Sequence, residues 1–221
     1  MTASPPTTTL LVIRHGETRW NLEERFQGHG DSPLTDLGRA QAGALARRLA
    51  AVPVDDLICS DLGRARETAA LISAETGHRV CSEPRLRERN FGVLEGLTVS
   101  QIKARYNDIF ERLYRLNDTA FVIPDGESLS QHHARCSAFF TELVETHAGR
   151  RVALVAHGGV LDSLMRYIQN APLEKPRWFI SANTSLNVVH HGVFYRTVRW
   201  VIETWGDVSH LDGVGHRLGL A

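Results

Sequence analysis

The chain has 221 residues, with 25 Lys and Arg against 25 Asp and Glu. This balance gives no overall field that would attract nucleic acid or an anionic membrane, so neither is an expected partner, and any anion site must be a local cluster. The length suits one domain, and no stretch is apolar enough to cross a membrane. The first residues lack the features of a signal peptide, so we expect a cytoplasmic protein with a disordered leader over 1–8 and a single domain over 9–221.

Hydrophobic periodicity predicts strands and helices that alternate along most of the chain. In chain order we expect strand 8–14, helix 36–51, strand 54–60, helix 61–76, a short strand near 79–82, helix 98–114, helix 127–148, strand 151–156, helix 159–170 and two strands within 184–204. This alternation implies right-handed crossovers and an α/β fold, a three-layer α/β/α sandwich around a mainly parallel sheet. The last two strands flank His191-Gly192, which indicates a hairpin and an antiparallel edge strand. An edge of this kind is compatible with a homodimer and with a monomer.

Three of the predicted strands end in polar residues that are typical of ligand sites. One apolar strand stops at Arg14 and His15, and a second stops at His157 and Gly158. A third leads into a helix whose first turn holds Arg64. A cation at that end of a helix opposes the helix dipole unless an anion shares the site. Because ligands gather at the carboxyl ends of strands in open α/β sheets, the pattern predicts a phosphate site there.

Several short motifs, each at the end of a predicted element, together resemble one protein family. They are Arg14 to Thr18, Trp20-Asn21, Pro33 to Thr35, Ser60 to Ala65, Glu88 and His157-Gly158. Their order and spacing resemble the histidine phosphatase superfamily, also called phosphoglycerate-mutase-like, across most of the chain. The resemblance implies a phosphoglycerate-mutase-like fold and identifies 9–221 as a single histidine-phosphatase domain.

The resemblance also implies a nucleophile and its cationic partners. In this family the histidine of the first motif attacks phosphorus and becomes a phosphohistidine, which makes His15 the nucleophile. It must be neutral to attack, and a carbonyl that accepts the proton of its other ring nitrogen would fix the tautomer, which the tight backbone path at Gly16 allows. Arg14 and Arg64 would hold the phosphoryl oxygens with planar, permanently charged forks.

The other matching residues supply a proton and neutral donors. Glu88 matches the family's proton donor, and we expect partial burial to raise its pKa by more than the neighbouring arginines lower it. His157, Asn21 and the helix that begins near Gly158 would add hydrogen-bond donors to the same oxygens. The implied partner is a small-molecule phosphomonoester, with no metal and no cofactor.

The residues that separate the mutases of the family from its phosphatases favour a phosphatase. The glycolytic mutases continue after a Gly-Leu pair with a lysine, and later carry paired arginines that grip a carboxylate and a second phosphate. Here Gly96-Leu97 leads to Thr98, and Arg112 is followed by Leu113. We therefore expect a phosphomonoester hydrolase that acts on small phosphorylated metabolites.

Two alternatives stay open. Lys103, Arg105, Arg112 and Arg115 could fold over the pocket and restore the charge that a cofactor-dependent phosphoglycerate mutase needs. A noncatalytic relative would bind phosphorylated ligands or proteins, although binding alone does not require a nucleophile and an acid together. The substrate also stays open among sugar phosphates, phosphoglycerate derivatives, nucleotide-pathway phosphates and α-ribazole phosphate.

Two histidine pairs, His132-His133 and His190-His191, are the remaining candidates for a metal site. Adjacent residues point in different directions on a helix or a strand, so neither pair can present both rings to one ion. We expect solvated or capping roles for them.

Overall fold

The computed structural model describes residues 6–216, which form one six-stranded sheet with helices on both faces. The strands are β1 Thr8–Arg14, β2 Asp56–Cys59, β3 Val80–Ser82, β4 Arg151–Ala156, β5 Leu186–Phe194 and β6 Thr197–Asp207. Their order is β3-β2-β4-β1-β5-β6. The first four run parallel, whereas β5 is antiparallel to β1 and β6 is antiparallel to β5. The predicted mainly parallel sheet with an antiparallel edge is confirmed.

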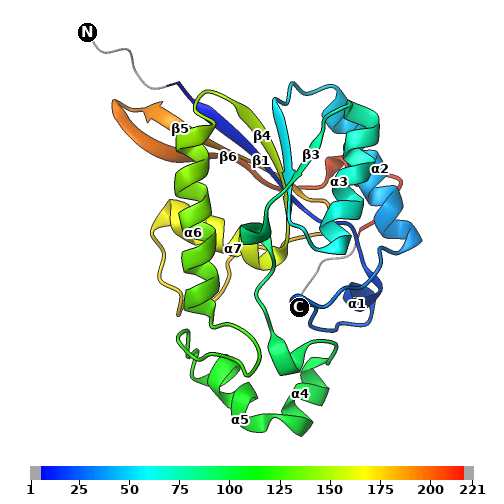
Figure 1. Cartoon of the computed structure of the whole chain (residues 1–221), viewed down its shortest axis with the longest axis vertical. Coiled ribbons are helices and arrows are strands. Elements are labelled where there is room, and N and C mark those ends of the chain that lie inside the picture. The colour runs from blue at the N-terminus through cyan, green and yellow to red at the C-terminus, as the bar shows by residue number, and fades with distance from the viewer. Residues whose placement is uncertain (1–5, 217–221) are drawn as a thin grey trace.

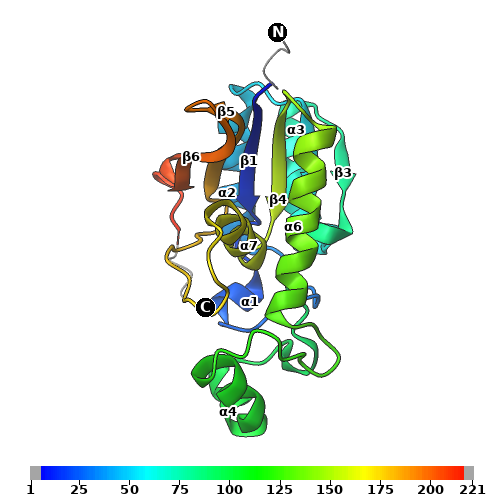
Figure 2. The same cartoon turned by 90° about the vertical axis from the view of Figure 1, so that its left-hand side faces the viewer.

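The helices complete the predicted α/β/α sandwich (Figure 1). They are α1 Arg19–Leu22, α2 Asp36–Ala50, α3 Gly63–Thr76, α4 Val99–Arg105, α5 Asn107–Phe110, α6 Leu129–Thr146 and α7 Gly158–Gln169. Side chains alternate across the buried strand β1, so Leu10 and Val12 pack on α6 and α7 while Leu11 and Ile13 pack on α2 and α3. Figure 2 shows α6 and α7 together on one side of β1 and β4.

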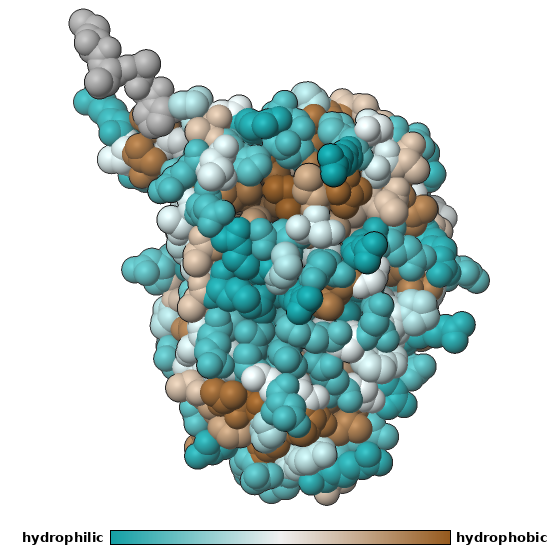
Figure 3. All heavy atoms as spheres, in the orientation of Figure 1, coloured by the Kyte–Doolittle hydropathy of each residue, from teal (hydrophilic) through white to brown (hydrophobic). Residues whose placement is uncertain are grey.

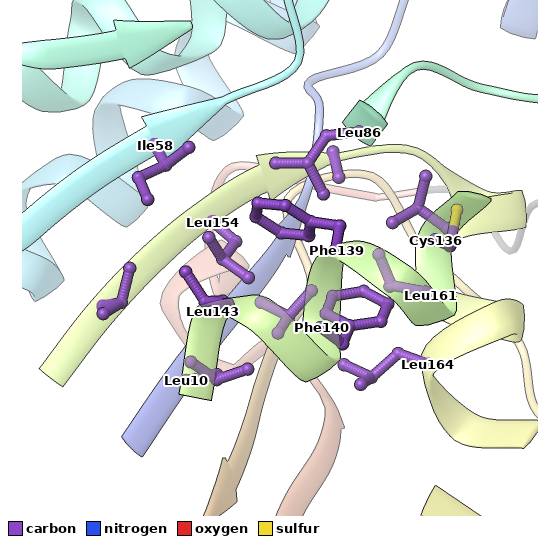
Figure 4. Close-up of a cluster of buried hydrophobic side chains, with 14 of the residues drawn as sticks. Leu10, Ile58, Leu86, Cys136, Phe139, Phe140, Leu143, Leu154, Leu161 and Leu164 are labelled. Carbon is purple, nitrogen blue, oxygen red and sulfur yellow. The ribbon is translucent and has the colours of Figure 1, made fainter. Parts of the chain in front are cut away.

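The cluster under α6 and α7 is built around two adjacent aromatic side chains of α6. Phe139 and Phe140 are both buried, with 5.6 Å between their ring centroids. Figure 4 shows them among leucines from α6, α7 and the strands, including Leu10, Leu154 and Leu164. This packing fixes α7 against the sheet and thereby fixes the start of α7 beside the end of β1.

The segment between β3 and α6 has a small apolar core of its own. Leu94, Ile102, Ile109 and Ile123 are buried together beyond the carboxyl ends of the strands. Figure 1 shows α4 and α5 in this outlying part, and Figure 3 shows hydrophobic residues on its surface. Exposed apolar side chains of the segment are Val99, Tyr114, Leu116 and Val122.

The single helix predicted over 98–114 is wrong. The chain leaves helical geometry at Tyr106, where φ is −137° and ψ is 52°, and then forms α5 and a π-helix over Glu111–Arg115. A straight helix would carry its later apolar residues away from the small core, whereas the break lets both halves wrap around it.

The predicted hairpin is confirmed, but the position expected for its turn is wrong. The turn lies at Tyr195 and Arg196, which both have positive φ, and Phe194 pairs with Thr197 across it. Gly192 lies inside β5, where a Cβ atom would come within 2.6 Å of the Thr7 side chain. The glycine is therefore required by a close approach of the chain start and not by a turn.

Part of the leader predicted over 1–8 lies outside the residues that the structure describes. Residues 1–5 are not among the described residues, while Thr8 is buried and already belongs to β1. Among the described residues, no helix combines the length and the apolar character that a bilayer span requires.

The packing of Phe140 gives a stability prediction. Replacing a fully buried phenylalanine by alanine removes its apolar contacts and leaves a cavity, so Phe140→Ala should lower the free energy of unfolding by about 3–5 kcal/mol. Leu116→Ala, at a side chain that is 71% exposed, is the matched control and should change it by less than about 0.5 kcal/mol. Urea unfolding followed by circular dichroism measures both, and equal effects would show that the α6 cluster is not the main core.

Candidate active site

A pocket of about 220 Å³ opens at the carboxyl ends of β1 and β4, where the sequence predicts the site. Six of the seven predicted site residues line it, and they are Arg14, His15, Asn21, Arg64, Glu88 and Gly158. The seventh, His157, has no exposed surface and packs beside His15, with 5.2 Å between the ring centroids. The fold therefore brings together residues that are more than 140 positions apart in the chain.

His15 is held in one tautomer by its own backbone. It follows β1 directly, and its Nδ1 lies 2.8 Å from the carbonyl oxygen of Gly16. A carbonyl only accepts, so Nδ1 carries the proton and Nε2 keeps its lone pair. Burial, followed by the nearby Arg64 and Arg14, holds the pKa of His15 well below its ordinary value. The ring is a neutral imidazole with a free lone pair, as nucleophilic attack requires.

Gly16 makes this arrangement possible because the backbone of α2 approaches it closely. A Cβ atom at Gly16 would lie 2.6 Å from the carbonyl oxygen of Gly38, which is shorter than any side chain tolerates. The chain can thus turn at once after His15, and the Gly16 carbonyl comes back to the ring.

Arg14 and Arg64 are both buried and are held by backbone carbonyl groups. Arg14 donates through Nη1 to the carbonyl oxygen of Ser181, and Arg64 donates to the carbonyl oxygens of Gly30 and Gly28 at 2.9 and 2.8 Å. Burial is the main reason that the pKa of each guanidinium is lowered, for Arg14 to about 10. The Nε–H of each side chain is buried and has no partner among residues 6–216.

His157 supplies a third buried nitrogen that has no hydrogen-bond partner among the described residues. Its Nε2 lies 2.8 Å from Ser60 Oγ, while its Nδ1 has no hydrogen-bond partner in the described part of the chain. Ser60 Oγ accepts from the amide of Leu62 at 3.4 Å, and we assign its hydroxyl proton to the bond with His157 Nε2, which places the imidazole proton on Nδ1. Burial, together with Arg64 and His15, holds the pKa of His157 well below its ordinary value.

Asn21 presents its amide nitrogen and not its oxygen. Its Oδ1 accepts from the backbone and hydroxyl of Thr18, both at 3.1 Å, and from Asn183 at 3.3 Å. Its Nδ2 makes no hydrogen bond to any described residue, and the side chain lines the pocket. Asn183 also donates to the carbonyl oxygen of His15 at 2.9 Å, so it ties the two motif residues together, a role that the sequence pattern did not reveal.

Glu88 lies opposite the start of α7. Its Oε2 accepts from the backbone amide of Gly159 at 3.0 Å, and its Oε1 accepts from the backbone amide of Arg89 at 2.8 Å. The amide of Gly159 is thus already used by the carboxylate, whereas that of Gly158, the first residue of α7, has no acceptor within the described part of the chain. The carboxyl group faces the pocket with 16% of its side chain exposed.

The predicted rise in the pKa of Glu88 is wrong for this structure. Burial is the largest single influence and does raise it, but His132, the two backbone amides and Arg64 together lower the pKa below its ordinary value. Apart from the amide of Arg89, the opposing groups come from other elements and could not be read from the local sequence. Glu88 is therefore a carboxylate in the protein without substrate.

Several wall residues of the pocket were missed by the sequence analysis. They are Arg25, Phe26, Gln27, Gly28, Arg89, Phe91, Leu129, His132, Asp162 and Arg177. Most lie on loops whose path no periodicity predicts. Arg89 and Phe91 were the exceptions that could have been found, because they follow Glu88 directly.

His132 contradicts the prediction that the His132-His133 pair is solvated or capping. His132 has no exposed surface and lines the pocket, whereas its neighbour His133 is only partly buried, since successive residues on α6 point about 100° apart. His190 of the other pair lies 2.6 Å from Glu203 on β6. Within residues 6–216 no three His, Cys, Asp or Glu side chains are grouped so that they could hold a metal ion.

The burial of His15 and His157 gives a prediction for their titration. Because burial and two arginines disfavour the imidazolium form, both rings should stay neutral as the pH falls below about 6.5, the ordinary value for histidine. NMR of ¹⁵N-labelled histidine rings between about pH 5 and 8 should show no titration of these two. The urea-unfolded protein is the control, and a midpoint near 6.5 for His15 in the folded protein would contradict the prediction.

Comparisons with known proteins agree with this geometry. The model of the family "Histidine phosphatase superfamily (branch 1)" matches residues 10–208. The chain is 37% identical to phosphoglycerate mutase-like protein 4 of Arabidopsis thaliana over 93% of this chain and 88% of that protein. It is 36% identical to the probable phosphoglycerate mutase GpmB of Yersinia pestis over 92% of this chain and 94% of that protein. A mycobacterial glucosyl-3-phosphoglycerate phosphatase has a similar structure, with a TM-score of 0.78 and 32% identity over 90% of this chain and 99% of that chain. The chain therefore belongs to branch 1 of the histidine phosphatase superfamily.

Proposed function

We propose that this protein hydrolyses small phosphomonoesters through a phosphohistidine on His15. One observation carries the proposal, namely that the buried N–H groups of Arg14, Arg64 and His157 have no partner among the described residues and surround a neutral imidazole. A buried donor without a partner costs about 1–3 kcal/mol, and more when it is charged. A tetrahedral phosphoryl group offers several acceptor oxygens and two negative charges, which would satisfy all three.

The first half of the reaction transfers the phosphoryl group to the protein. His15 Nε2 attacks phosphorus as the bond to the leaving oxygen breaks, while Arg14 and Arg64 stabilise the charge on the equatorial oxygens. Asn21 Nδ2 and the Gly158 amide add neutral donors at the same oxygens. Glu88 gives a proton to the departing alcohol.

Glu88 must gain that proton on substrate binding. In the protein alone its pKa is lowered, but a phosphoryl dianion that binds beside it is a like charge and raises the pKa again. After the alcohol leaves, the carboxylate accepts a proton from water, whose oxygen attacks the phosphohistidine. His15 is released neutral, and inorganic phosphate leaves.

The outer pocket supports hydrolysis over mutase chemistry. Its wall contains none of the four cations of the outlying segment that could have supplied a second anion site, and these are Lys103, Arg105, Arg112 and Arg115. Arg112 instead lies 3.8 Å from Asp118, and Arg115 lies 3.3 Å from Glu111. The wall combines the apolar Phe26, Phe91 and Leu129 with three further arginines, Arg25, Arg89 and Arg177. Of these, Arg25 is paired with Glu23 and Arg89 donates to the carbonyl oxygen of Glu127.

The substrate class follows from the pocket. A cavity of about 220 Å³ accommodates a phosphoryl group and a small organic residue. The relatives include proteins named as mutases and one named as a phosphatase of a glucosylated phosphoglycerate, so phosphorylated hydroxy acids and sugar phosphates are the first compounds to test. A cytoplasmic location stays a prediction.

The experiment measures phosphate release from a panel of phosphomonoesters without added metal. His15→Ala should lower kcat/KM by at least about 10³-fold, since the nucleophile is removed and the binding groups remain. In parallel, 3-phosphoglycerate is tested for conversion to 2-phosphoglycerate with and without 2,3-bisphosphoglycerate. Isomerisation that depends on the bisphosphate and proceeds without release would show a mutase, and binding without either reaction would show a noncatalytic relative.

A further inference from the structure

His132 is a buried titratable side chain that lines the active-site pocket and has no place in the mechanism above. Its ring is held on three sides. Nδ1 lies 3.2 Å from Ser163 Oγ on α7, and Nε2 lies 3.6 Å from Cys136 Sγ on α6. The same Nε2 lies 3.9 Å from Oε1 of Glu88. The ring therefore bridges α6 and α7 and directs one nitrogen at the acid of the reaction.

Two acidic and two basic groups act on the protonation of this ring in opposite directions. Glu88 and Glu127 favour its protonation, while Arg89 on the same loop as Glu88 and Arg135 on α6 oppose it. His157, on the far side of the site, also interacts with it but is neutral. Burial outweighs these charges and lowers the pKa of His132 to about 4, so the ring is neutral near pH 7 and carries a charge that lowers the pKa of Glu88 only in acid.

The balance changes when a phosphoryl dianion binds. Two new negative charges enter beside Glu88 and His132, and like charges in a buried site raise the proton affinity of both groups. The pair then takes up one proton. Oε1 and Nε2 lie 3.9 Å apart in the protein alone, so sharing the proton requires this contact to tighten to hydrogen-bond distance when substrate binds, as catalytic contacts do.

Building on the proposed phosphatase reaction, we propose that His132 is a positioning residue that shares one proton with Glu88 and so keeps that carboxyl group ready to protonate the leaving alcohol. The proton resides on His132 Nε2 or Glu88 Oε1. It passes to the leaving oxygen as the bond from phosphorus to that oxygen breaks and the bond from phosphorus to His15 Nε2 forms. In the second half, water gives one proton back to Glu88 as its oxygen attacks phosphorus and the bond from phosphorus to His15 Nε2 breaks. The pair then holds the one proton it took up on substrate binding, and it releases that proton to solvent when phosphate leaves.

The neighbouring His133 provides a built-in contrast. It lies on the same helix, one residue further on, and its Nε2 is 3.4 Å from Ser137 Oγ. It does not line the pocket. His133 is only partly buried, so it controls for a histidine-to-amide change on α6, whereas contact with Glu88 belongs to His132.

The test compares two substrates whose leaving groups need a proton to different degrees. Glycerol phosphate releases an alkoxide that must be protonated, whereas p-nitrophenyl phosphate releases a stable phenolate that needs no acid. For each, kcat/KM reports only the steps up to the phosphohistidine. His132→Gln keeps a polar group facing Glu88 but cannot carry the proton, and His132→Asn keeps the contact to Ser163 instead.

We expect both variants to lower kcat/KM for glycerol phosphate by about ten-fold or more, part of the 10²–10⁴-fold effect of an acid catalyst, and to change it less than about two-fold for p-nitrophenyl phosphate. The dependence of kcat/KM on pH should differ between the wild type and both variants for glycerol phosphate. For p-nitrophenyl phosphate it should be the same. His133→Gln is the matched control and should leave kcat/KM unchanged for both substrates.

An equal loss on both substrates would mean that His132 only supports the fold, and no loss on either would mean that Glu88 works without it. Each result overturns the proposal. Thermal unfolding of the variants separates instability from chemistry, and two variants with different retained contacts guard against failure of one to fold. Failure of the proposed function itself would appear differently, as a wild-type protein whose phosphate release is absent or survives His15→Ala.

Discussion

The site depends on the burial of two guanidinium groups beside two imidazoles, at the point where β1 and β4 end. Arg14 and Arg64 are 8% and 1% exposed, and burial of like charges is costly unless their donors are satisfied. Backbone carbonyls satisfy part of each side chain, and the carboxylate of Glu88 supplies opposite charge. The Nε–H groups of both side chains have no partner among residues 6–216, and in the proposed function they bind the phosphoryl anion. Burial, followed by these positive charges, keeps His15 and His157 neutral, whereas the low pKa of Glu88 comes from His132 and two backbone amides before Arg64.

Most of the sheet could be predicted from the sequence because its strands are short apolar runs that end abruptly. The hairpin turn could not, since Tyr195 and Arg196 are not the residues that usually adopt positive φ, whereas Gly192 is. The helix expected over 98–114 failed for another reason. Its apolar spacing is helical throughout, and only the small core around Ile102 reveals why the chain must bend at Tyr106.

The features of the site also divide into those that the sequence predicted and those that only the structure revealed. Five of the seven motif residues, Arg14, His15, Arg64, His157 and Gly158, come together because each stands at or just after the end of a strand or in the first turn of a helix, which sequence patterns locate well. Asn21 and Glu88 lie outside every helix and strand that was predicted, and only the resemblance to the family pointed to them. The protonation of Glu88 and the place of His132 depend on contacts between α6, α7 and the loop after β3, and no local pattern contains them. Charge balance in a buried site is a property of the packed elements, so it could be learned only from the structure.

The most direct test of this account is to look for the covalent intermediate. The protein is mixed rapidly with a phosphomonoester, quenched in alkali and digested, and the phosphorylated peptide is mapped by mass spectrometry. The account predicts a base-stable, acid-labile phosphoryl group on His15, which accumulates further in Glu88→Gln when p-nitrophenyl phosphate is the substrate. Turnover with no phosphoryl group on His15, or with one on another residue, would contradict it.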